Sequence, residues 1–176
     1  MKNILGKVYI SRRFSKMKKM DYNGIMLCKI QANLFKNYRE YSSCSPYFFI
    51  RRFMNSHLSE RFDDMTILLE ASSDETFINE IDEQYGKTTF GKADSISPEV
   101  MYWVGYVYRY WSYIYEVPSH LLFKQVQPKL LFDRYYLYHS MDIEYAIERI
   151  CEEETILISP NKTLQEIIDE FIKDNQ

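Results

Sequence analysis

The feature that most constrains this chain is one run of aromatic residues near its middle. In the segment Met101–Tyr115, eight of fifteen residues are aromatic and the single charge is Arg109. Residues 97–99, Ser-Pro-Glu, supply an N-cap, a proline suited to the first helical position and an acid in the first turn. Pro118 disfavours helix at the residue before it. The run therefore predicts a helix of about five turns that is apolar on most sides and central to a small domain.

Composition supports a single helical domain around that segment. A length of 176 residues fits one domain, and 46% hydrophobic with 27% charged residues suffices for a core and for solubility. Only five glycines and five prolines are present, too few for the tight turns of an all-β sandwich. We predict a mainly α, single-domain bundle of six to eight helices around a central aromatic helix at about 98–116.

Apolar spacing and capping residues place the other helices. Upstream of the aromatic run, the pattern predicts three helices, over 21–38, 46–62 and 76–85. The second is predicted as one element with His57 on its apolar face. The third is opened by a Ser72/Glu75 capping box and ended by Gly86. Residues 65–70 are compatible with helix or strand. Downstream, it predicts helices over 118–126, 128–138 and 141–150, the last capped by Ser140, and an amphipathic helix opened by Asn161 or Thr163.

Charge is unevenly distributed along the chain. Residues 1–20 hold seven basic residues and no acid, so the remaining 156 residues have a net charge of −10. A basic arm is typical of nucleic-acid or membrane contact, but we favour an incorrectly assigned start, with Met17 or Met20 beginning the domain. We therefore divide the chain into a basic arm at 1–20, disordered or mis-assigned, a helical domain at 21–154, and a C-terminal amphipathic helix at 155–176 that docks or binds a partner.

Several functional classes are disfavoured by what the sequence lacks. The three cysteines, Cys28, Cys44 and Cys151, form no C-x-x-C pair, which argues against disulfides and zinc and favours a reducing, cytoplasmic location. No stretch of about eighteen uninterrupted apolar residues is present; the aromatic helix comes nearest, but Glu99, Arg109 and Glu116 interrupt it. Nucleotide-binding and hydrolase motifs are absent, and only three histidines are present. We expect no cofactor, no metal and no membrane association, and we favour a non-enzymatic role while keeping a catalytic alternative open.

One short pattern nevertheless suggests a catalytic alternative. Arg134 and His139 are separated by four residues, as in the sequence Arg-Tyr-Tyr-Leu-Tyr-His. This resembles the R-x(4–6)-H signature of the HEPN ribonucleases, which are small all-helical proteins. The resemblance implies a ribonuclease toxin in which His139 transfers protons and Arg134 holds the phosphate. The alternative is that His139 ends a helix and Arg134 is a surface cation.

The aromatic helix itself offers candidate binding residues. Arg109 shares a face with Tyr102, Tyr106 and Tyr113, and the four could form an anion pocket walled by tyrosines. We favour instead a buried ion pair with cation–π stacking, because an unpaired buried arginine is strongly destabilising. Exposed tyrosines could also stack on nucleic-acid bases. The net negative charge of the chain after residue 20 would repel nucleic-acid phosphates, however. Tyrosine is also enriched at protein–protein interfaces.

A broader similarity points in the same direction. The segment 102–111, with Ile-Arg-Arg-Phe at 50–53 and the segments 138–142 and 146–149, resembles a small bacterial family that we associate with toxin–antitoxin-type gene clusters. The similarity spans roughly residues 45–150 and transfers no catalytic residue. It implies an antitoxin or accessory protein that binds a protein partner, such as a basic toxin. The alternatives are the HEPN-like ribonuclease and a nucleic-acid binder; a homo-oligomer is compatible with each.

Overall fold

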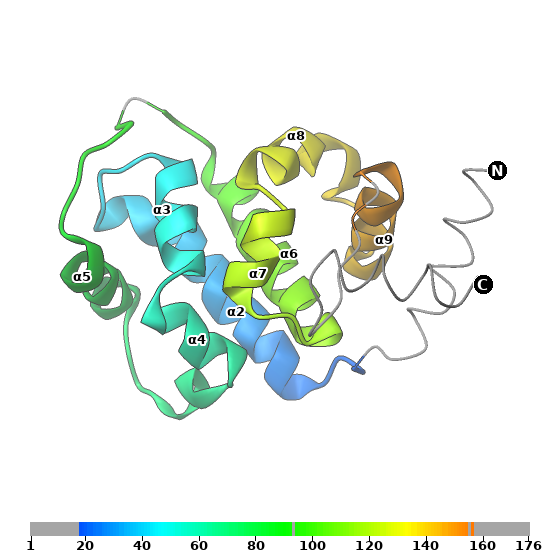
Figure 1. Ribbon diagram of the computed structural model, residues 1–176, viewed down its shortest axis with the longest axis horizontal. Coiled ribbons are helices and arrows are strands. Elements are labelled where there is room, and N and C mark those ends of the chain that lie inside the picture. Colours follow the sequence, from blue (N-terminus) through cyan, green and yellow to red (C-terminus); the bar gives the residue numbers. More distant parts are fainter. Residues whose placement is uncertain (1–17, 93, 155, 157–176) are drawn as a thin grey trace, which may run out of the picture.

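Helix α6 (Pro98–Tyr115) runs through the centre of the fold (Figure 1). The Ser97 hydroxyl accepts a hydrogen bond from the Val100 amide, Pro98 occupies the first turn, and Glu116 ends the helix in a left-handed conformation at φ 51°. Fourteen of its eighteen residues are buried. The predicted all-α fold around a central aromatic helix is thereby confirmed. Trp111 of this helix is fully buried.

The computed structural model describes residues 18–92, 94–154 and 156. Eight α-helices and two 3-10 helices form within these residues, and no strand does. The elements besides α6 are, in chain order, α2 (Tyr22–Asn37), η2 (Tyr38–Glu40), α3 (Pro46–Met54), α4 (His57–Asp63), η3 (Thr66–Leu69), α5 (Asp74–Tyr85), α7 (Ser119–Gln125), α8 (Pro128–Tyr138) and α9 (Ile143–Glu154).

Helix α2 lies antiparallel to α6 and forms the most extensive contact in the fold. Their close approach requires Gly105, where an added Cβ would come within 3.0 Å of the Ala32 Cα and the Gln31 carbonyl oxygen. The Gln31 side-chain amide donates to the Gly105 carbonyl oxygen at 3.1 Å. Because both glutamine and backbone are buried, this bond also satisfies polar groups that water cannot reach.

The single helix predicted over 46–62 is wrong, since the structure breaks it into α3 and α4. Asn55 leaves the helical conformation, and Ser56 starts α4 by accepting from the Ser59 amide through its side chain. The Ser56 hydroxyl also donates to the Phe53 carbonyl oxygen. A serine that caps a new helix competes with continuation of the old one. His57 consequently lies in the first turn of α4, exposed rather than on the predicted apolar face.

Two other helix starts differ from the prediction by one or two residues. Ser73, not Ser72, caps α5 by accepting from the Thr76 amide, while the predicted stop at Gly86 is confirmed at φ 80°. Helix α9 begins at Ile143 rather than 141, because the Asp142 carboxylate accepts from the Glu144 amide. The undecided run at 65–70 contains the 3-10 helix η3. The helix predicted after Asn161 lies outside the described residues.

The end of the predicted basic arm contacts the helical body. The Lys18 amide donates to the Ile114 carbonyl oxygen at 2.9 Å, and its ammonium lies 3.9 Å from the centre of the Tyr113 ring. Met20 packs against the core. Residues 18–20 therefore belong with the helical body and not with the arm, whose residues 1–17 lie outside the described part of the chain.

Candidate functional site

Arg109 forms a buried ion pair with Asp63. Its guanidinium donates to the Asp63 carboxylate at 2.7 Å, to the Gln31 side-chain oxygen at 2.8 Å and to the Ser119 hydroxyl at 2.9 Å. The same group lies 5.2 Å from the centre of the Phe62 ring. The Arg109 side chain is 1% exposed and that of Asp63 is 19% exposed. The ion pair and the cation–π contact expected for a buried arginine are both present.

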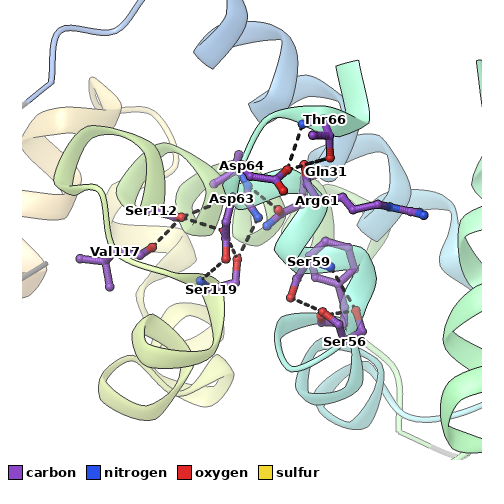
Figure 2. A network of polar contacts seen from close by, with 12 residues as sticks. Gln31, Ser56, Ser59, Arg61, Asp63, Asp64, Thr66, Ser112, Val117 and Ser119 are labelled. Atoms are coloured by element: carbon purple, nitrogen blue, oxygen red, sulfur yellow. Dashed lines mark hydrogen bonds and ion pairs between the residues drawn. The ribbon is translucent and has the colours of Figure 1, made fainter. Parts of the chain in front are cut away.

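The Asp63 carboxylate also holds the start of α7 (Figure 2). One oxygen accepts from the Ser119 amide at 2.8 Å, and the other accepts from the hydroxyls of Ser119 at 2.6 Å and Ser112 at 3.3 Å. Helix α7 needs this external acceptor because its own N-cap residue, Pro118, has no side-chain hydrogen bond to offer. A carboxylate at the end of α4 therefore fixes α7 against α6.

A cavity of about 210 Å³ opens beside this ion pair. Two cations, Lys18 and Arg109, and two carboxylates, Asp63 and Glu116, line it. An anion entering the cavity would meet as many negative as positive groups, and the Arg109 guanidinium is already paired. The geometry therefore supports a structural ion pair rather than the alternative of a phosphate pocket. Of the four residues predicted for binding, Arg109 and Tyr113 lie together here.

The other two predicted binding residues lie elsewhere on α6, in a row of stacked rings. Tyr102 and Tyr106 have ring centres 6.4 Å apart, and Tyr106 and Tyr110 have ring centres 6.3 Å apart. We term these three residues the tyrosine ladder. Tyr102 and Tyr106 are half-buried, whereas Tyr110 is 8% exposed. Burial foremost, followed by the nearby carboxylates Glu144 and Asp142, raises the pKa of Tyr110 to about 12.

Glu144 belongs to a row of acids on α9. Glu144, Glu148 and Glu152 recur every four residues and so lie on one side of the helix. We term them the acidic face. Burial raises the pKa of Glu148, and the charges of Glu144, Glu152 and Asp142 raise it further. The charges of these acids therefore repel one another, on a helix that contacts α6, the helix that carries the tyrosine ladder.

Arg134 and His139 are engaged with different groups. The Arg134 guanidinium pairs with Glu154 at 2.6 Å and Glu153 at 3.3 Å, which joins α8 to α9. The exposed His139 side chain hydrogen-bonds to the Tyr135 carbonyl oxygen at 2.9 Å and stacks on the Tyr135 ring. His139 is the C-cap of α8. No hydrogen bond or ion pair between Arg134 and His139 is formed among the described residues.

Sequence reasoning identified Arg109 but not its partners. Asp63 is 46 positions away and Gln31 is 78, and nothing in local spacing links either of them to an arginine in an aromatic run. The acidic face did carry a signal, since Glu144, Glu148 and Glu152 are four residues apart.

Two kinds of site are absent from the described residues. Among residues 18–92, 94–154 and 156, no group of three or more His, Cys, Asp or Glu side chains is arranged to hold a metal ion. None of the helices in that same part of the chain combines the length and the apolar character of a bilayer span. Comparisons with protein-family models, with curated proteins and with solved structures find no match to this chain.

Proposed function

We propose that this chain is a non-enzymatic, protein-binding component, acting as the antitoxin or accessory member of a toxin–antitoxin-like module. Its partner would be a basic protein, such as a toxin that acts on nucleic acid. The observation that supports this proposal is the contact between α9, which carries the acidic face, and α6, which carries the tyrosine ladder. Aromatic side chains with complementary charge around them are typical of protein–protein interfaces.

The two edges of α9 differ in a way that favours this assignment. On the edge toward α8, Glu153 and Glu154 pair with Arg134. On the acidic face, Glu144 and Glu148 form no ion pair with any described residue, and Glu152 has only Arg149 at 3.9 Å. Unpaired carboxylates next to half-buried tyrosine rings disfavour nucleic acid, whose phosphates they would repel. They favour lysine and arginine side chains instead.

Affinity capture followed by measurement with the purified partner tests the proposal. Tagged full-length chain is used to isolate partners from its native host at low salt. The captured protein is then produced separately, and its dissociation constant is measured over a range of NaCl concentrations. We expect the triple variant Glu144→Gln, Glu148→Gln, Glu152→Gln to bind more weakly and to lose most of the salt dependence, because surface charge attraction is screened by salt.

The chain offers a charge-matched control at its opposite end. Glu60, Glu75 and Glu83 are exposed acids on α4 and α5, and Figure 1 shows α5 and α9 at opposite ends of the long axis. The triple variant with Gln at those three positions should bind as the unchanged chain does. An equal loss of affinity in both triple variants would show that binding depends only on the net charge of the chain. No loss of affinity in either variant would exclude the acidic face as the binding surface.

A further inference from the structure

We infer that the cavity beside the Asp63–Arg109 pair binds a small zwitterion, namely a free amino acid with an apolar side chain. The ammonium group of the ligand would lie at Asp63 and Glu116, and its carboxylate at Lys18. The inference is independent of the proposed function, because the cavity shares no residue with the acidic face or with the tyrosine ladder.

The cavity presents two opposite charges that do not neutralise each other. Asp63 and Arg109 form the one ion pair found among the described residues that line it. Lys18 and Glu116 line the same cavity without an ion pair between them. A simple anion would be attracted by Lys18 and repelled by Glu116, and a simple cation would meet the reverse. A zwitterion can face both side chains at once, so the charge balance that disfavours a phosphate favours this class of ligand.

Asp63 has an oxygen available to an ammonium group. Its Oδ1 accepts from the Arg109 guanidinium and from two serine hydroxyls, whereas its Oδ2 accepts only from the Ser119 amide among the described residues (Figure 2). A carboxylate oxygen has two acceptor positions. The Asp63 side chain is 19% exposed and lines the cavity. The last turn of α6 also borders the cavity, and the partial negative charge at the C-terminus of a helix favours a cation there.

Lys18 is placed to receive the carboxylate of the ligand. Its amide donates to the Ile114 carbonyl oxygen at 2.9 Å, which fixes its backbone beside the last turn of α6. Its ammonium lies 3.9 Å from the centre of the Tyr113 ring, and Tyr113 also lines the cavity. Asp21 is within electrostatic range of Lys18 but is not among the lining residues. An ammonium has three N–H donors, so one that rests on a ring face retains donors for a ligand oxygen.

The backbone around the cavity is strained. Met65 at φ 65° and Glu116 at φ 51° are the two non-glycine residues with a left-handed conformation in the described part of the chain, and both line the cavity. Glycine is the usual residue in this conformation at the end of a helix. Glutamate at position 116 adopts it at a conformational cost, and it supplies a carboxylate that glycine lacks. Strain of this kind concentrates at binding and catalytic sites.

Volume and apolar walls narrow the ligand class. The volume of about 210 Å³ is below the range of about 300–1,000 Å³ that is typical of pockets for drug-sized molecules. The ligand must therefore be smaller than such molecules. Phe62, Met65, Val117 and Pro118 supply apolar wall, which suits an aliphatic side chain such as that of leucine.

Isothermal titration calorimetry of the full chain with free leucine, isoleucine, valine and methionine tests the inference. Two analogues of leucine each lack one charge: isoamylamine has no carboxylate, and isocaproate has no ammonium. We expect leucine to bind, and each analogue to bind about tenfold or more weakly, because a charge-assisted hydrogen bond is lost. Equal affinities for leucine and both analogues would overturn the inference, as would the absence of binding by any of the amino acids.

Single substitutions assign the two charges. Glu116→Gln should reduce the preference for leucine over isocaproate, and Lys18→Gln should reduce the preference for leucine over isoamylamine. Lys19→Gln and Glu99→Gln are charge-matched controls, because both residues are exposed and neither lines the cavity. The controls should bind leucine as the unchanged chain does. Equal loss of leucine affinity in the controls and in the cavity variants would overturn the inference.

Glu116→Gly separates ligand binding from stability. Glycine adopts the left-handed conformation without steric cost, so this variant should melt at a higher temperature than the unchanged chain. It should nevertheless bind leucine as weakly as Glu116→Gln, because the carboxylate is absent from both. A more stable variant with unchanged leucine affinity would show that Glu116 contacts no ligand and would overturn the inference.

Discussion

Asp63 and Arg109 form a 2.7 Å ion pair across 46 positions of sequence, and a single Asp63 carboxylate both neutralises Arg109 and caps α7. The pair therefore joins three helices, α4, α6 and α7, at one point. Because Arg109 is 1% exposed, loss of its partner would leave a buried charge that water cannot solvate.

Replacing Asp63 with Ala should therefore lower the free energy of unfolding by about 3 kcal/mol or more, the range for breaking a buried pair on one side. Chemical denaturation followed by tryptophan fluorescence measures this change. Arg134→Ala is the control, since its pair with Glu154 lies near the surface and such pairs contribute about 1 kcal/mol or less. Similar small losses in both variants would show that the Asp63–Arg109 pair has no special role in stability.

Trp111 is fully buried in the central helix, so Trp111→Ala should destabilise the fold by about 3–5 kcal/mol. The cavity left by the indole accounts for most of this loss. Trp111→Phe should cost less, because the ring is partly replaced and the indole N–H, which has no hydrogen-bond partner among the described residues, is removed. Thermal or denaturant unfolding measures both variants. A loss below about 1 kcal/mol for the alanine variant would show that α6 is not the core.

Gly105→Ala tests the contact between α2 and α6. The new Cβ would meet backbone atoms of Ala32 and Gln31 at 3.0 Å, and backbone cannot move aside as a side chain can. Overpacking of this kind costs about 1–3 kcal/mol, which outweighs the higher helix propensity of alanine. A neutral or stabilising Gly105→Ala would contradict the close packing.

The fold could be predicted because its signals are local. Ser97, Pro98 and the aromatic run specify α6, and Gly86 ends α5, through interactions within a few residues. The break at Asn55 was missed because the apolar spacing continues through it, while a serine cap competes only through its hydrogen bonds. The partners of Arg109 were missed for a different reason. Tertiary packing alone brings Gln31 and Asp63 to it, and no local spacing encodes that arrangement.

Asp21 should make stability depend on pH below neutrality. Its carboxylate accepts from the Gly24 amide, then from the Tyr113 hydroxyl, and these bonds lower the pKa of Asp21 below its ordinary value of 3.8. A carboxylate with a lowered pKa in the folded state stabilises the fold above its unfolded pKa. That stabilisation is lost as the pH falls through the lowered folded value.

Asp21→Asn keeps an N-cap but removes the titrating charge. We therefore expect its melting temperature to fall less steeply than that of the unchanged chain as the pH is lowered from 5 toward 2.5, on the order of the range in which aspartates titrate. Asp64→Asn is the comparison, because the bonds from Thr66 likewise lower the pKa of Asp64 without contact to Tyr113. Identical pH profiles for the unchanged chain and Asp21→Asn would exclude a contribution from Asp21.

The last prediction separates the binding function from the ribonuclease alternative. In the structure the Arg134 guanidinium forms ion pairs with Glu153 and Glu154. His139 caps α8 and hydrogen-bonds to the Tyr135 carbonyl oxygen. If the chain is a binder, its expression alone should leave growth unaffected and His139→Ala should have almost no effect on partner capture. A ribonuclease would instead arrest growth, and either Arg134→Ala or His139→Ala would relieve the arrest, because proton transfer near neutrality depends on the imidazole. Growth curves after induction measure both outcomes, with circular dichroism confirming that each variant is folded. We expect no arrest by the unchanged chain; arrest relieved by either variant would replace the binding proposal with the catalytic one.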